Sequence, residues 1–125
     1  MSYIAMNRFK IRPGREADFE TIWKDRESRL NEMQGFREFR LLKGPQNEEY
    51  TLYCSHVIWD SRADFEAWTK SEQFRAAHRN AGKREGESPI LGAPQFEGFE
   101  TVLQQKFHHF YNIEMYEFSQ KLEDI

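Results

Sequence analysis

The chain has one cysteine, no long hydrophobic run and no large excess of either charge. Cys54 alone forms neither an internal disulfide nor a cysteine metal cluster, which indicates a reducing compartment. No apolar stretch approaches the roughly 20 residues needed to span a bilayer, and no basic segment precedes the strand pattern that begins at Tyr3. The net charge is −3, from 18 basic and 21 acidic residues spread along the chain. We therefore expect a cytoplasmic protein with no nucleic-acid or membrane partner.

The sequence also lacks an internal repeat, a low-complexity segment and a flavin or nicotinamide motif. Its 125 residues suit one domain with a hydrophobic core. Aromatic residues are in surplus, since eleven Phe, five Tyr and three Trp make up 15% of the chain. A large flat ligand, bulky core packing and a subunit interface are all uses for that surplus.

Hydrophobic periodicity and turn residues predict one α+β domain over residues 1–103. Residues 3–11 alternate as a β-strand, and Asn7 lies in the middle of the more apolar face, with Tyr3, Ala5, Phe9 and Ile11. The remaining elements are predicted, in chain order, as a helix over 16–33, strands over 36–42 and 50–59, helices capped by Ser61 and Ser71, a loop over 83–95 and a strand over 96–103. This order predicts an antiparallel sheet with helices on one face. Apolar spacing beyond it predicts an amphipathic helical tail over 104–125.

Asn7, Trp68 and His78 are the residues that suggest chemistry. Each has an ordinary explanation by itself: Asn7 bonds neighbouring backbone, Trp68 packs in the core, and His78 is exposed or hydrogen-bonded. An amide among apolar neighbours is nevertheless costly without a partner. Their local contexts are Asn7-Arg8-Phe9 and Trp68 followed, after nine residues, by His78.

This combination resembles the haem site of the IsdG-type haem-degrading monooxygenases, members of the antibiotic biosynthesis monooxygenase superfamily. The resemblance covers about residues 3–103 and is sharpest over 58–78. It extends to Trp23, Arg26-Glu27-Ser28, Gly35-Phe36 and Glu87-Ser88-Pro89. It implies a ferredoxin-like fold, paired through the sheets of two subunits into a dimeric α/β-barrel with one haem pocket in each subunit.

The resemblance also implies a role for each residue. His78 would be the proximal iron ligand, Asn7 would donate a hydrogen bond to oxygen bound on the iron, and Trp68 would press the ring out of plane. Haem would be both the substrate and the cofactor that activates O2. The ring would open at a meso carbon, with electrons from a reductase or ascorbate, and would release iron and a linear tetrapyrrole.

Four further residues are expected near the ligand. Trp23 and Phe74 line the pocket or belong to the core, and Arg26 and Arg79 pair with the haem propionates or lie on a solvated helix face. Two other functions stay open: a cofactor-free monooxygenase of an aromatic substrate, and a non-catalytic haem-binding or haem-sensing protein. The tail would cover the pocket mouth, extend the dimer interface or dock a reductase.

Overall fold

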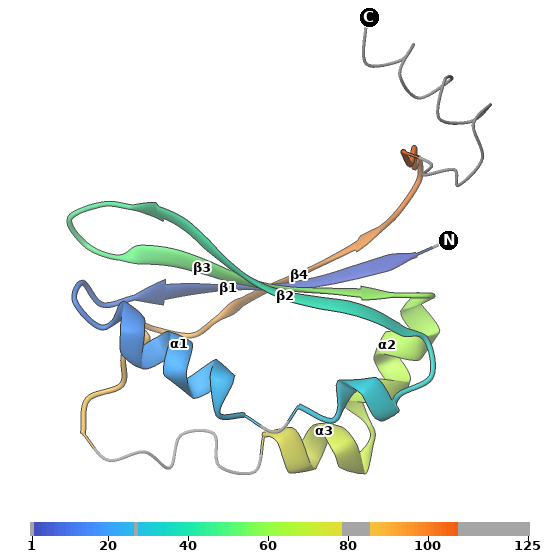
Figure 1. Cartoon of the computed structure of the whole chain (residues 1–125), viewed down its shortest axis with the longest axis horizontal. Coiled ribbons are helices and arrows are strands. Elements are labelled where there is room, and N and C mark those ends of the chain that lie inside the picture. Colours follow the sequence, from blue (N-terminus) through green and yellow to red (C-terminus); the bar gives the residue numbers. More distant parts are fainter. Residues whose placement is uncertain (1, 27, 79–85, 108–125) are drawn as a thin grey trace, which may run out of the picture.

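The computed structural model describes residues 2–26, 28–78 and 86–107. Its elements are β1 (Tyr3–Ile11), α1 (Glu16–Lys24), the 3₁₀ helix η1 (Leu30–Glu32), β2 (Phe36–Gln46), β3 (Thr51–Trp59), α2 (Arg62–Thr69), α3 (Glu72–Ala77) and β4 (Gln95–Glu100). The strands form one antiparallel sheet in the order β2-β3-β1-β4, and the helices lie along one face of it (Figure 1). The predicted ferredoxin-like α+β arrangement is confirmed. No helix within these ranges is long and apolar enough to cross a bilayer.

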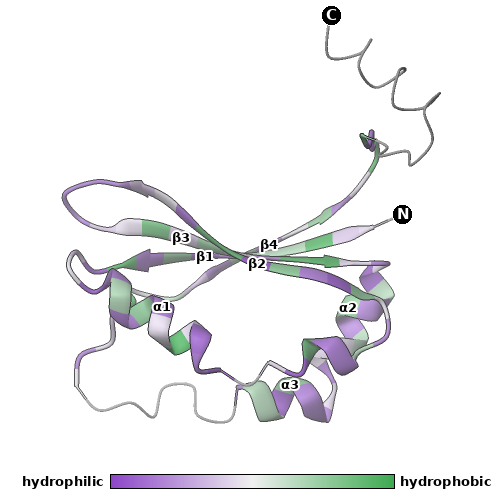
Figure 2. Ribbon diagram, viewed as in Figure 1, coloured by the Kyte–Doolittle hydropathy of each residue, from purple (hydrophilic) through white to green (hydrophobic). Residues whose placement is uncertain are grey.

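The alternation of β1 gives the sheet two different faces. Tyr3, Ala5, Phe9 and Ile11 point toward the helices and are buried, as the sequence predicts. Hydrophobic and hydrophilic segments alternate along the strands and helices, whereas the turn between β2 and β3 is hydrophilic (Figure 2).

The core on the helix side of the sheet divides into two clusters. One contains Tyr3, Ala5, Leu30, Trp59 and Trp68, and the other contains Phe9, Ile11, Phe19 and Tyr53. Asn7 lies in β1 between Ala5 of the first cluster and Phe9 of the second. The division of the core therefore falls at the one polar residue on this face of β1.

The predicted helix over 16–33 is wrong in its second half, because α1 ends at Lys24 and the chain turns before η1. Arg29 adopts a left-handed conformation with φ of 57°. The backbone N–H of Leu30 donates to the Ser28 hydroxyl at 3.0 Å, and Leu30 is buried in the core. A side chain that bonds nearby backbone competes with the hydrogen bonds of a helix. The apolar residues therefore keep their helical spacing up to Met33, although α1 has already ended.

Helices α2 and α3 begin at the predicted caps, Ser61 and Ser71. The Ser71 hydroxyl also bonds to both helices. The Ser61 hydroxyl accepts the N–H of Asp64 at 3.1 Å and begins α2. The Ser71 hydroxyl accepts the N–H of Phe74 at 3.0 Å and donates to the carbonyl of Trp68 at 2.6 Å. Ser71 therefore begins α3 and ties it to the last turn of α2, which fixes the direction of the turn between them.

The strand ends and the predicted loop differ in detail from the prediction. Strand β2 continues to Gln46 through an irregular register after Lys43, and β4 ends at Glu100. Within the predicted 83–95 loop, the described residues 86–94 are bonded to the end of β1: Pro89 accepts from the N–H of Arg12 at 2.8 Å, and Leu91 donates to Lys10 at 2.7 Å. Residues 104–107 of the predicted tail are not helical, and 108–125 lie outside the described residues.

Candidate functional site

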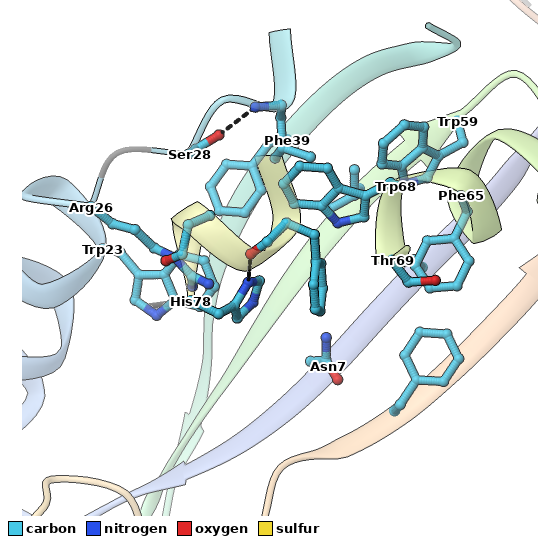
Figure 3. A pocket seen from close by; sticks show the side chains of 16 residues that line it. Asn7, Trp23, Arg26, Ser28, Phe39, Trp59, Phe65, Trp68, Thr69 and His78 are labelled. Atoms are coloured by element: carbon cyan, nitrogen blue, oxygen red, sulfur yellow. Dashed lines mark hydrogen bonds between the residues drawn. The ribbon is translucent and has the colours of Figure 1, made fainter. Parts of the chain in front are cut away.

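A cavity of about 330 Å³ lies between the sheet and the helices. Six of the seven site residues predicted from the sequence line it: Asn7, Trp23, Arg26, Trp68, Phe74 and His78. Figure 3 shows Asn7 rising from β1 toward the layer of α2 and α3, from which Trp68 and His78 come. The seventh, Arg79, lies outside the described residues. Its expected contact with a propionate stays a prediction.

The Asn7 side chain is half-buried at the floor of the cavity. Ser55 lies opposite it on β3 and Phe96 on β4. Within the described part of the chain, the Asn7 amide has no hydrogen-bond partner. The expected bond to neighbouring backbone is therefore not present among these residues. An amide with its donors unused at the edge of a cavity can bind a ligand.

Trp68 forms part of one wall and belongs to the core as well. It is 7% exposed, and its ring lies 6.2 Å from that of Trp59 and 5.4 Å from that of Phe74, centroid to centroid. The Trp68 indole therefore packs in the core on one side and lines the cavity on the other. Because aromatic neighbours enclose most of the ring, its position is stiff toward anything in the cavity.

His78 ends α3 with its ring partly buried against the cavity. Its Nδ1 lies 2.7 Å from the carbonyl oxygen of Phe74, and the ring lies 4.1 Å from the Phe74 ring. A carbonyl only accepts, so Nδ1 carries the hydrogen and Nε2 is left with a free lone pair. Burial lowers the pKa of His78, the bond to Phe74 raises it, and the Arg26 charge lowers it again, with a net shift downward. The ring is therefore neutral at pH 7, as a metal ligand must be.

Arg26 lies at the opposite side of the cavity from Trp68. Its Nε–H donates to the carbonyl of Ala77 at 3.2 Å, and its guanidinium lies 4.7 Å from the Trp23 ring centroid. No carboxylate in the described ranges pairs with it. Burial lowers the pKa of Arg26, but the ordinary value of 12.5 is high enough that the group stays charged at neutral pH. A half-buried cation without a counter-charge favours an anionic ligand.

Sequence analysis missed several aromatic walls of the cavity. Phe39 stacks on Trp23 at 5.5 Å, and Phe96 stacks on Phe65 at 5.5 Å with only 6° between the rings. Phe96 is 49% exposed, which is unusual for a residue that packs only in a core. Phe96 could have been identified as a cavity residue from its position across from Asn7 in the sheet. That strand register is not available from the sequence alone.

The cavity therefore combines flat aromatic walls with an imidazole, an amide and a guanidinium, besides the hydroxyls of Ser28 and Thr69. No set of three or more His, Cys, Asp or Glu residues that could hold a metal occurs in the described ranges. A bare metal ion would find one nitrogen ligand here, too few for a stable site. A metal already held in a flat organic ring needs only one axial ligand, and such a ring suits these walls.

The chain is similar to known proteins in sequence and in fold. The sequence profile of the family described as antibiotic biosynthesis monooxygenase matches residues 2–80. The chain is 33% identical over 66 residues to a heme oxygenase (staphylobilin-producing) of Staphylococcus haemolyticus, a match that spans 52% of this chain and 64% of the relative. It is 28% identical over 91 residues to the protein of that name in Staphylococcus saprophyticus, spanning 72% of this chain and 86% of the relative.

The fold has solved counterparts too. The heme-degrader MhuD of Mycobacterium tuberculosis, solved with two hemes bound in its active site, superimposes with a TM-score of 0.62 over 83% of this chain and 99% of that one. The two sequences are 23% identical, so this likeness shows the fold alone.

Proposed function

The chain belongs to the antibiotic biosynthesis monooxygenase family, and from this premise we propose that it is a haem-degrading monooxygenase. The reaction would be opening of the haem ring at a meso carbon with O2 and external electrons, releasing iron and a linear tetrapyrrole. The observation that carries the proposal is His78, whose Nδ1 is bonded to the Phe74 carbonyl while Nε2 has no bond to any described residue, beside a cavity shared with Asn7 and Trp68. The names of the staphylococcal relatives support it.

The residues present fit an iron porphyrin. Histidines that bind metals commonly donate their second ring N–H to a backbone carbonyl, which orients the ring and strengthens the ligand. His78 has this arrangement with the carbonyl of Phe74. The aromatic rings of Trp23, Phe39, Phe65 and Phe96 supply flat apolar contact, and Arg26, which pairs with no carboxylate among the described residues, suits a propionate.

Asn7 and Trp68 would have different roles toward the bound ring. The bound haem would supply the oxygen activation, and these two side chains would control where it acts. Asn7 would donate a hydrogen bond from the sheet side of the cavity, where negative charge develops during the reaction. Trp68, enclosed by Trp59 and Phe74, would hold its position and so press against one side of the ring.

The electrons would come from outside the chain, from a reductase or from ascorbate, because no flavin or nicotinamide motif is found in the sequence. The single Cys54 supports a reducing, cytoplasmic setting. We further propose that two subunits pair through the sheet face opposite the helices. Leu42 and Phe99 lie on that face and are 40% and 46% exposed.

A titration with haemin, followed by ascorbate under air, tests the function. The parent protein should give a shifted Soret band that decays into a product absorbing at other wavelengths, and His78→Ala should lose the shift. No shift, or a shift that His78→Ala leaves unchanged, contradicts the proposal. Stable haem under reductant and air would instead indicate a haem-binding or sensing protein. Turnover of a phenolic substrate without iron would indicate a cofactor-free monooxygenase.

A further inference from the structure

Arg26 connects two helices that the sequence places far apart. It follows the end of α1, and its Nε–H donates to the carbonyl of Ala77, the last residue of α3. His78 is the next residue in the chain, and it lies against the same cavity. The contact therefore reaches the turn that carries the imidazole.

This turn needs support from elsewhere in the molecule. Helix α3 has only six residues, and helices this short have little stability by themselves. The carbonyls of a last helical turn also lack donors within the helix. Ser71 holds the start of α3, and Arg26 supplies a donor at its end.

Trp23 makes this contact directional. The guanidinium lies over the Trp23 ring at 4.7 Å, and Trp23 in turn stacks on Phe39 of the sheet. Because a guanidinium is planar, stacking it in this way fixes the directions of its N–H bonds. Nε is committed to Ala77, which leaves the two terminal nitrogens for a ligand or solvent.

We propose that Arg26 is a positioning residue for His78: from its stack on Trp23 it holds the carbonyl of Ala77 and thereby sets the orientation of the imidazole. This role is separate from the contact with a propionate, and one guanidinium can provide both because they use different nitrogens. The proposal rests on the proposed function only for the identity of the ligand that His78 binds.

The test uses ligand-free protein, so it does not depend on haem. Arg26→Met is compared with Arg62→Met, which removes an exposed arginine of α2 paired with Glu66. Hydrogen exchange of the backbone amides of Ala76, Ala77 and His78 should become about tenfold faster in Arg26→Met and stay within about twofold in Arg62→Met. Nitrogen-15 NMR of the His78 ring should show a single Nδ1–H tautomer in the parent and in Arg62→Met. A mixture of tautomers is expected in Arg26→Met.

Unchanged exchange and an unchanged tautomer in Arg26→Met would overturn the proposal. If that variant does not fold, the parent decides the question. The Nε–H of Arg26 should exchange with water at least about tenfold more slowly than that of Arg62, and equal rates would overturn the proposal. Failure of the parent to bind haemin would remove the proposed function and leave these results standing.

Discussion

At the scale of single residues, contacts within the protein orient the imidazole of His78. His78 is neutral, has its Nδ1–H committed to Phe74, and lies with its ring against the ring of that residue. Binding of a ligand to the Nε2 lone pair therefore costs little free energy for orienting the imidazole. Asn7 is the opposite case, because its amide has no partner among the described residues and lines the cavity, where a ligand could supply one.

This contrast gives a prediction for Asn7. Asn7→Ala and Asn7→Asp both remove the N–H donor, and the second keeps the size of the side chain. Both should bind haemin within about threefold of the parent and degrade it about 100-fold more slowly, the usual loss when a donor to developing charge is removed. Haemin titration and the rate of Soret decay measure the two quantities. An equal loss of binding and rate would show that Asn7 has a packing role.

At the scale of elements, two hydrogen-bonded junctions hold the helices that carry cavity residues. Ser71 joins α2 to α3 and so fixes Trp68 relative to His78. On the far side, the hydroxyl of Tyr53 on β3 donates to Glu20 and holds α1 on the sheet. The two junctions lie on opposite sides of the divided core.

Ser71→Ala tests the first junction, with Ser61→Ala as its matched control. Each substitution removes an N-cap and should lower the free energy of unfolding by about 1 kcal/mol, measured by urea denaturation. Only Ser71→Ala also removes a hydroxyl donor from the carbonyl of Trp68, which then keeps only the backbone N–H of residue 71. It should therefore weaken haemin binding about tenfold, whereas Ser61→Ala should not. Equal effects of the two variants on haemin binding would contradict this assignment.

The second junction predicts a loss of stability in alkali. Burial raises the pKa of Tyr53, and the bond to Glu20 raises it further, above the ordinary value of 10.0. The unfolded chain therefore loses this proton at lower pH than the folded protein does. The stabilising contribution of Tyr53 is complete below about pH 9 and falls above about pH 10, by up to about 1.4 kcal/mol for each pH unit.

Thermal melts between pH 8 and 11 measure this loss, and Tyr53→Phe is the control. The variant lacks the bond to Glu20, so it should be less stable at pH 8 by about 1 kcal/mol. Its stability should then decline more gently with pH, and the two curves should approach each other. Parallel curves would show that other groups cause the alkaline loss.

At the scale of the whole molecule, the two faces of the sheet have different uses. One face supports the helices and the cavity, and no described helix covers the other (Figure 1). Ile4 lies on the uncovered face beside Ile58 and Phe99, and Leu42 lies beside Cys54. Apolar residues gathered on an open sheet face favour a partner sheet.

Phe99→Asp tests the proposed pairing of two subunits. A carboxylate on a face that is buried by pairing is costly, so the dissociation constant of the dimer should rise at least about tenfold. Size-exclusion chromatography with light scattering gives the mass at each concentration. Thr21→Asp, on the exposed side of α1, should leave the mass unchanged. A parent protein that is monomeric, or a Phe99→Asp protein with the parent's mass, would contradict the pairing.

The sequence by itself determined the features that depend on near neighbours. Alternation placed Asn7 on the buried side of β1, and Ser61 and Ser71 marked the starts of α2 and α3. Each of these follows from bonds or spacing within a few residues, which the order of amino acids contains directly.

Only the tertiary structure decided the features that depend on distant neighbours. The position of Phe96 across from Asn7 and the contact of Arg26 with Ala77 both join segments separated along the chain. Helical spacing continues past Lys24, so periodicity could not reveal the break. The site is therefore only partly present in the sequence: the residues that carry its chemistry can be identified there, but strand register and helix packing bring them to one cavity.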